Sequence, residues 1–302
     1  MKTLLVITGP TGVGKTELCL RVAEQLLSPV INADSRQIYR EIPIGTAAPT
    51  EVEQARVKHY FVGTKSVTED YNAGQYERDC LALLDELFLT HDTLLLSGGS
   101  MMYVDAVCKG LDDIPSVPEE IRREVQEGYK TNGLSWLQAE VQRLDPDYWK
   151  QVDRQNPQRL MHCIEVSLTT GQAYSGFRQA SHRQRPFRIV KVGLERPREE
   201  LYARINARVN KMVDEGLVEE ARSVLPYRHC NSLNTVGYKE MFRYLDGEWS
   251  LDRAIEMIQQ NSRHYAKRQI TWLRADNEIQ WQQLTANNIE KTVDYVISGL
   301  HL

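Results

Sequence analysis

One glycine-rich segment has the residue types and spacing that bind phosphate. It reads Gly9-Pro10-Thr11-Gly12-Val13-Gly14-Lys15-Thr16 and fits the pattern G-x-x-x-x-G-K-[ST]. Its glycines allow backbone N–H groups to curve around an anion, and the N-terminus of a following helix adds positive dipole. Lys15 supplies a charge for phosphate oxygens, and the Thr16 hydroxyl can bind Mg²⁺. We therefore predict that these eight residues bind a phosphate compound, which the loop alone does not identify, with Thr16 as the metal ligand.

A second candidate is the segment Asp34-Ser35-Arg36-Gln37, which follows an apolar run. The Asp34 carboxylate could accept a proton, bind a metal or cap a turn, and the sequence leaves these alternatives open. The Gln37 amide is suited to a paired contact with an adenine edge. The segment is therefore a candidate for contact with an acceptor substrate.

A third candidate, Gly98-Gly99-Ser100, follows the apolar run Leu94–Leu96. Nucleoside triphosphatases usually have a metal-binding aspartate at the end of the corresponding strand, and this sequence has Ser97 and glycines there. Ser100 could donate a hydrogen bond to a leaving phosphate oxygen, or it could be an ordinary turn residue. The triphosphatase interpretation is weakened, and Asp34 is left as the best-placed carboxylate.

The elements that would position these groups alternate between strands and helices. We predict strands at Leu4–Thr8, Pro29–Ala33 and Thr93–Leu96, and helices at Thr16–Leu27 and Tyr76–Leu89. This alternation predicts an α/β fold with a parallel sheet flanked by helices. The three candidate segments would then meet at the carboxyl ends of the strands, where such sheets bind ligands.

The pattern changes near residue 113. Three helical segments and no convincing buried strand precede a strand at Phe187–Leu194. We therefore predict a catalytic core of residues 1–112 and 188–302, with a mostly helical insertion at residues 113–187. The predicted insertion helices are Glu119–Tyr129, Leu134–Leu144 and Pro157–Thr169.

Two more helices are predicted after the returning strand. The first begins at Pro197 and places Arg204, Arg208 and Lys211 on one face, because these residues are spaced at i, i+4 and i+7. The second runs from about Leu251 to Leu273.

Charge is distributed unevenly along the 302 residues. The net charge is −4, yet the stretch from Arg154 to Lys211 has twelve Lys or Arg and four Glu. This excess suggests either a polyanionic partner or a solvated basic surface. The apolar runs are too short to cross a membrane, and no leader segment is visible, so we expect a cytoplasmic protein with no membrane partner.

The sequence resembles the tRNA dimethylallyltransferases, also called tRNA isopentenyltransferases, along nearly its whole length. It departs from the usual family pattern at Ala48 (usually Lys), Ser100 (Thr), Met101-Met102 (Gly-Leu) and His162 (often Arg). No C-terminal zinc finger follows, which indicates the bacterial type. The matching segments, in order, are GPTGVGKT at 9–16, DSRQIY at 34–39, IGTAAPT at 44–50, GGSMMY at 98–103, NPQRLMHCIEV at 156–166, TGQAYS at 170–175, RINARVNKM at 204–212, VGYKEM at 236–241 and AKRQITWLR at 266–274.

The resemblance implies a P-loop NTPase-like fold and transfer of a dimethylallyl group from dimethylallyl diphosphate to tRNA. The acceptor would be N6 of the adenosine directly 3′ of the anticodon. Asp34, Ser100 and Arg208 would be catalytic, and Mg²⁺ would be the cofactor. We expect a monomer whose insertion binds the anticodon stem-loop. The residues that would contact tRNA are Asp34, Ser35, Arg36, Gln37, Ser100, Arg122, Gln158 and Arg159.

Three other functions compete with this one. A small-molecule P-loop kinase would share the glycine loop but would need a metal-binding acid on a strand and an arginine-bearing lid. An adenylate isopentenyltransferase would use a free nucleotide and lacks the long helical insertion. A non-enzymatic RNA-binding module would leave the phosphate loop and Asp34 without a role.

Overall fold

The structure is a computed structural model that describes residues 1–178, 183–285 and 287–300. The chain forms two compact units: Met1–Cys108 with Arg185–Leu302, called here the core unit, and Lys109–Gln184, called the inserted unit. Both boundaries fall a few residues before those predicted, and residues 179–182 of the predicted insertion lie outside the described residues.

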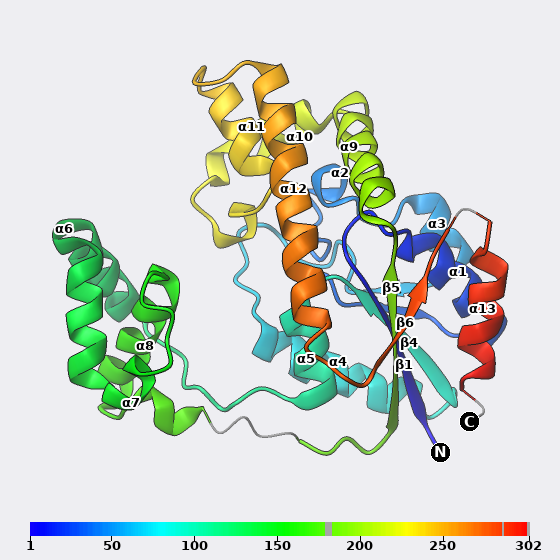
Figure 1. Cartoon of the computed structure of the whole chain (residues 1–302), viewed down its shortest axis with the longest axis horizontal. Helices are drawn as coiled ribbons and strands as arrows, with labels where there is room; N and C mark the ends of the chain where they lie inside the picture. Colours follow the sequence, from blue (N-terminus) through cyan, green and yellow to red (C-terminus); the bar gives the residue numbers. More distant parts are fainter. Residues whose placement is uncertain (179–182, 286, 301–302) are drawn as a thin grey trace. The chain divides into compact units, whose positions relative to one another are not determined.

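The core unit is built on a six-stranded parallel sheet with strand order β3-β2-β4-β1-β5-β6 (Figure 1). The parallel sheet confirms the predicted fold class. The strand β6 was not predicted, because its sequence IQWQQ has no apolar run. The strands are β1 Thr3–Thr8, β2 Val30–Asn32, β3 His59–Tyr60, β4 Thr93–Gly98, β5 Arg188–Glu195 and β6 Ile279–Gln283.

Helices cover both faces of this sheet. Side chains of β1 alternate between the faces, so Leu5 and Ile7 pack with α1 and α13, whereas Leu4 and Val6 pack with α4 and α5. All four β1 side chains are fully buried, as the predicted parallel sheet requires. The helix bounds are α1 Lys15–Leu26, α4 Ala73–Leu87, α5 Met101–Lys109 and α13 Ile289–Ser298.

A further helical cluster of the core unit has its own apolar centre, which includes Ile42, Leu217 and Tyr238. The helix α12 joins this centre to the sheet: Ile258 packs in the cluster, and Ala266 packs against the sheet and α1 (Figure 1). The helices are α2 Pro43–Thr46, α3 Glu51–Arg56, α9 Arg198–Asp214, α10 Leu217–Val224, α11 Tyr238–Leu245 and α12 Leu251–Leu273.

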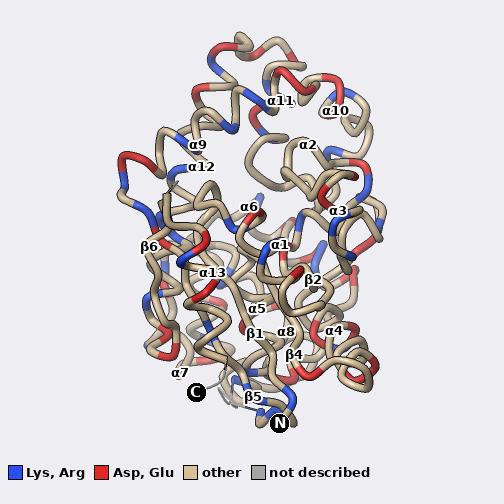
Figure 2. The backbone as a smooth tube through the Cα atoms, turned by 90° about the vertical axis from the view of Figure 1, so that its right-hand side faces the viewer, with Lys and Arg blue, Asp and Glu red and all other residues tan. Residues whose placement is uncertain are grey.

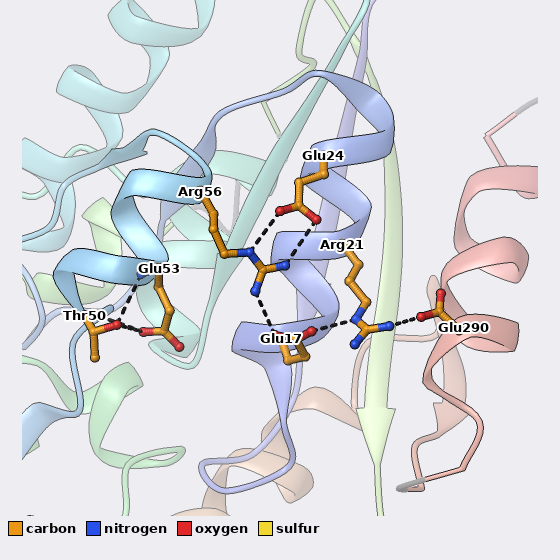
Figure 3. Close-up of polar contacts among 7 residues, drawn as sticks. All are labelled: Glu17, Arg21, Glu24, Thr50, Glu53, Arg56 and Glu290. Atoms are coloured by element: carbon orange, nitrogen blue, oxygen red, sulfur yellow. Dashed lines mark hydrogen bonds and ion pairs between the residues drawn. The ribbon is translucent and has the colours of Figure 1, made fainter.

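Ion pairs tie α1 to its neighbours on the outer side of the sheet (Figure 3). The Glu17 carboxylate accepts hydrogen bonds from Arg21 Nε at 2.6 Å and Arg56 Nη1 at 3.2 Å. Arg56 also donates to both oxygens of Glu24, and Arg21 pairs with Glu290 of α13. Exposed pairs are individually weak, so the network acts collectively in placing α3 and α13 against α1.

The inserted unit is helical throughout its described residues, with α6 Glu119–Leu144, α7 Pro146–Trp149 and α8 Pro157–Thr170. Gly133 interrupts α6 with φ 73° and ψ −168°, which reproduces the two helices predicted on either side of it. Within the described residues, no helix is both long enough and apolar enough to cross a membrane.

Candidate functional site

The glycine-rich loop lies between β1 and α1, as predicted. Gly9, Gly12 and Gly14 have φ values of 154°, 80° and 105°, which L-residues with side chains rarely adopt. Space is also restricted: a Cβ on Gly12 would lie 2.8 Å from Cγ1 of Ile205. Both observations explain why glycines occupy these positions.

Lys15 at the start of α1 lies folded against this loop. Its Nζ donates hydrogen bonds to the carbonyl oxygens of Gly9 at 2.8 Å and Pro10 at 3.0 Å. Burial and the nearby Arg208 lower the pKa of Lys15 to about 8, while Asp34 acts in the opposite direction. Such a lysine gains most from an anion that neutralises the surrounding positive charge.

Two arginines of α9 reach the same loop. Arg208 donates to Thr11 Oγ1 at 2.6 Å and to the Thr46 carbonyl at 3.1 Å, and Arg204 donates to the Gly12 carbonyl at 2.9 Å. Burial lowers the pKa of both guanidinium groups. Lys211, predicted on the same helix face, lies at the surface and pairs with Glu215. Two of the three basic residues on that face of α9 therefore contact the glycine loop.

Arg196, at the end of β5, is a functional candidate that the sequence did not reveal. Its side chain is only 5% exposed, pairs with Glu200 and donates to the Val13 carbonyl at 2.6 Å. No motif pointed to this residue, because its contact depends on the pairing of β5 with β1.

Asp34 follows β2 and has two distinct carboxylate oxygens. Its Oδ1 accepts N–H hydrogen bonds from Arg36 at 2.9 Å and Gln37 at 3.4 Å, which is a turn-capping role. Its Oδ2 has no hydrogen-bond partner among the described residues. The Asp34 charge also lies close enough to Lys15 and Arg208 to oppose, in part, the lowering of each pKa by burial. The carboxylate is thus oriented by one oxygen while the other is available for chemistry.

Ser100 joins the loop after β4 to the loop after β2. Its hydroxyl accepts from the Ser35 N–H at 2.7 Å and donates to Ser35 Oγ at 3.0 Å, and its own N–H donates to the Ala33 carbonyl. Its hydroxyl is therefore occupied by Ser35 in this structure, and contact with a phosphate oxygen requires that bond to be exchanged. The Ala33 carbonyl also fills the space where a side chain on Gly98 would lie.

Gln269 of α12 lies in the matching segment 266–274, but the sequence assigned it no role. Its side chain is buried, accepts from the Thr11 N–H at 2.9 Å and donates to the Gly99 carbonyl at 2.8 Å. It thereby joins the phosphate loop to the turn after β4. Its burial could have been inferred from its spacing, because Gln269 lies on the same helix face as the buried Ala266 and Leu273.

Gln37 is placed differently from the prediction of a paired adenine contact. Its Nε2 donates to the carbonyls of Thr46 at 3.2 Å and Ala47 at 2.9 Å. Only its carbonyl oxygen remains available, so a paired contact would require these bonds to break. The neighbouring Arg36 donates to the Asn231 carbonyl.

The three predicted contacts of the inserted unit, Arg122, Gln158 and Arg159, are exposed. Within the described residues, their side chains have no hydrogen-bond or ion-pair partners. They belong to the inserted unit, whereas the glycine loop belongs to the core unit.

The basic residues from Arg154 to Lys211 are divided between the two units. Eight of these twelve Lys and Arg residues belong to the core unit, and several have internal partners. Arg185 pairs with Glu77 at 2.7 Å, and the buried Lys191 pairs with Asp276 at 2.8 Å. Only four of the twelve basic residues lie in the inserted unit, so that unit does not account for the basic excess. Figure 2 shows acidic and basic residues interspersed over α1, α3 and α13.

Metal binding would rest on few protein ligands. The described part of the chain contains no group of three or more His, Cys, Asp or Glu residues that could hold a metal ion. Thr16 is exposed at the start of α1, and its hydroxyl has no hydrogen-bond partner in that part of the chain. Mg²⁺ commonly takes one or two protein ligands together with substrate phosphates, so Thr16 fits that type of site.

Comparison with known proteins is consistent with this geometry. A family model described as IPP transferase matches residues 37–276. The chain belongs to the IPP transferase family. It is 57% identical to tRNA dimethylallyltransferase 1 of Phocaeicola vulgatus, over 92% of this chain and 93% of that protein. It is 56% identical to tRNA dimethylallyltransferase 1 of Bacteroides thetaiotaomicron, over 93% of this chain and 91% of that one.

Solved structures extend the IPP transferase likeness to the fold. The full-length tRNA isopentenylpyrophosphate transferase from Bacillus halodurans superposes with a TM-score of 0.72 at 32% identity, covering 100% of this chain and 97% of that one. A eukaryotic dimethylallyltransferase acting on tRNA superposes with a TM-score of 0.82 at 22% identity, covering 99% and 80%. The second likeness concerns the fold alone.

Proposed function

We propose that this protein transfers a dimethylallyl group from dimethylallyl diphosphate to N6 of the adenosine directly 3′ of the anticodon in tRNA. The reaction forms a bond between N6 and the allylic carbon, breaks the bond from that carbon to oxygen, and removes one proton from N6. One observation carries the proposal: Lys15, Arg204 and Arg208 contact the glycine loop, and Asp34, whose charge affects Lys15 and Arg208, has one carboxylate oxygen without a hydrogen-bond partner among the described residues. Membership of the IPP transferase family and the names of its relatives support it.

The loop Gly9–Thr16 would bind the diphosphate. Its N–H groups and the N-terminus of α1 favour an anion, and Lys15 and Arg208 would neutralise the charge that grows on the departing diphosphate. In the described part of the chain, no carboxylate forms an ion pair with Arg208, so its charge is available to a ligand. Mg²⁺ bound by Thr16 and the phosphate oxygens would supply further neutralisation of the leaving group.

Asp34 would take the proton from N6. Its Oδ1 is fixed by backbone N–H groups, which leaves Oδ2 to act as the general base. Ser100 would release Ser35 and donate to the oxygen between carbon and phosphorus as that bond breaks. The target adenine must leave its stack in the anticodon loop to reach these groups.

The tRNA would be held by residues of both units. Asp34, Ser35, Arg36, Gln37 and Ser100 would contact the acceptor nucleotide, and the inserted unit would bind the anticodon stem-loop. That unit is not basic overall, so its affinity would depend on particular side chains that have no partner among the described residues, namely Arg122, Gln158 and Arg159. We further propose that the protein acts as a monomer in the cytoplasm.

The experiment that tests the proposal uses labelled dimethylallyl diphosphate with three acceptors: unmodified tRNA, AMP and a small-molecule hydroxyl compound. We expect label in unmodified tRNA, in the nucleoside 3′ of the anticodon, and none in AMP. Label in AMP instead of tRNA would support an adenylate isopentenyltransferase. ATP turnover in a parallel reaction of ATP with the small-molecule hydroxyl compound would support the kinase, and tRNA binding with no transfer would support an RNA-binding module.

A further inference from the structure

Glu220 of α10 is a buried carboxylate outside the cluster around the glycine loop. Its Oε2 accepts from the Ile44 N–H at 2.7 Å, its Oε1 accepts from the Gly45 N–H at 2.7 Å, and the Tyr238 hydroxyl also donates to Oε1. Ile44 and Gly45 lie in the first turn of the short helix α2, where N–H groups have no partner within the helix. One carboxylate, 9% exposed, therefore satisfies three donors from two distant segments.

The segment held in this way is fitted closely to its surroundings. The fully buried Tyr238 ring occupies the space where a side chain on Gly45 would lie. The segment ends at Ala47, whose φ of 45° is unusual for a residue with a side chain. An unusual backbone angle persists only where surrounding contacts fix it.

The carbonyl oxygens of this segment are in turn acceptors for two residues of the proposed active site. The Thr46 carbonyl accepts from Arg208 Nη2 at 3.1 Å and from Gln37 Nε2 at 3.2 Å, and the Ala47 carbonyl accepts from Gln37 at 2.9 Å. Arg208 belongs to the diphosphate side of the site, and Gln37 to the acceptor side. One backbone segment therefore orients a residue on each side.

We infer that Glu220, together with Tyr238, is a positioning residue that fixes the segment Pro43–Ala47 and thereby orients Arg208 and Gln37. This inference rests on the proposed function, because it assigns Glu220 a role in that reaction. Only a carboxylate satisfies all three donors at this position. A glutamine would direct its NH₂ group toward N–H and O–H donors and leave at least one of them unsatisfied.

The first test compares Glu220→Gln with Glu219→Gln, the same change at the adjacent exposed residue. We expect Glu220→Gln to lower kcat/KM for prenyl transfer by about tenfold to a hundredfold, the scale of a displaced catalytic group. Glu219→Gln should retain the wild-type value, and circular dichroism should show both variants folded. A wild-type kcat/KM for Glu220→Gln would overturn the inference.

A double-mutant cycle distinguishes positioning from a general loss of stability. Arg208→Lys is made in the wild-type protein and in the Glu220→Gln variant, and kcat/KM is measured for all four proteins. If Glu220 acts through Arg208, the arginine change should cost clearly less activity when Glu220 is already altered. Equal losses in both backgrounds would overturn the inference.

Tyr238→Phe serves if Glu220→Gln fails to fold. It removes one hydroxyl and keeps both N–H bonds to Glu220, so we expect about a threefold loss in kcat/KM with the same non-additivity toward Arg208→Lys. Additive losses, or wild-type activity, would again overturn the inference. The failure of the proposed function would be seen separately, as an inactive wild-type protein.

Discussion

The proposed site residues of the core unit and of the inserted unit are held in opposite ways. Thr11 in the phosphate loop is bonded to Gln269, which follows it by 258 residues, whereas Arg122 and Arg159 have no side-chain partners among the described residues. Bond making and breaking require reacting groups fixed to within a fraction of an ångström. Contacts with a nucleic-acid backbone mainly provide charge and tolerate adjustable side chains. We therefore expect the fixed residues of the core unit to act in the chemical step and those of the inserted unit to act in binding.

The largest expected effect is that of Lys15→Ala. It removes the point charge closest to the loop carbonyls, so prenyl diphosphate binding should weaken and single-turnover transfer should fall by about a thousandfold or more. The affinity for tRNA, measured by filter binding, should stay within about twofold of the wild type. Turnover within tenfold of the wild type would remove the phosphate loop from the reaction.

Asp34→Asn should have the next largest effect. The amide keeps an oxygen for the N–H groups of Arg36 and Gln37 but cannot take a proton, so the turn should persist while the chemical rate falls about a hundredfold. Single-turnover rates at saturating tRNA measure this loss, and thermal unfolding checks the turn. Recovery of the rate with added Mg²⁺ would instead assign Asp34 to metal binding.

A pH series gives a smaller effect with a defined sign. The pKa of Lys15 is lowered from 10.5 to about 8, so the free protein loses this positive charge as the pH rises through 8. Affinity for prenyl diphosphate should therefore be full below that pH and should fall by up to about tenfold between pH 8 and 9. Lys15→Arg should show a flatter profile, because arginine stays charged. If the wild type and Lys15→Arg showed the same dependence of affinity on pH, Lys15 would not be the group whose charge controls prenyl diphosphate binding.

The smallest effects are expected in the inserted unit. Arg122→Ala or Arg159→Ala should weaken tRNA binding by about threefold to tenfold and should reduce the salt dependence of binding by about one phosphate contact. Binding of prenyl diphosphate should not change. Arg143→Ala is the matched control, because Arg143 already pairs with Glu140 in the same unit. An unchanged salt slope in both arginine variants would show that this unit does not hold the RNA through these residues.

The sequence was sufficient to predict the elements whose signals are local. Apolar runs predicted β1, β2, β4 and β5 to within a residue or two, and helical periodicity predicted α12 at Leu251–Leu273. The edge strand β6 was missed because its alternating polar residues resemble a loop. Strand order, by contrast, depends on pairings between distant segments, so local signals could not predict it.

Contacts within the site also divide into local ones, which the sequence predicts, and long-range ones, which it does not. The glycine loop, with its special φ values, was predictable because each of its residues has a local reason. The bridging role of Gln269 and the two backbone N–H bonds accepted by Glu220 were not predictable, since these contacts join segments far apart in the chain. Gln37 illustrates the limit: its residue type suited a base contact, yet tertiary neighbours use its NH₂ group.

The position of β5 in the sheet has a consequence for how the protein is made. Thr3 of β1 pairs with Arg188 of β5, so one edge of the strand that leads into the phosphate loop stays unpaired until residues 188–195 leave the ribosome. At about 5–20 residues per second, that interval is roughly ten to forty seconds. The inserted unit is one continuous stretch of chain and is complete by Gln184, so it can fold first. During synthesis, the newly made helical unit therefore precedes the closure of the sheet on which catalysis depends.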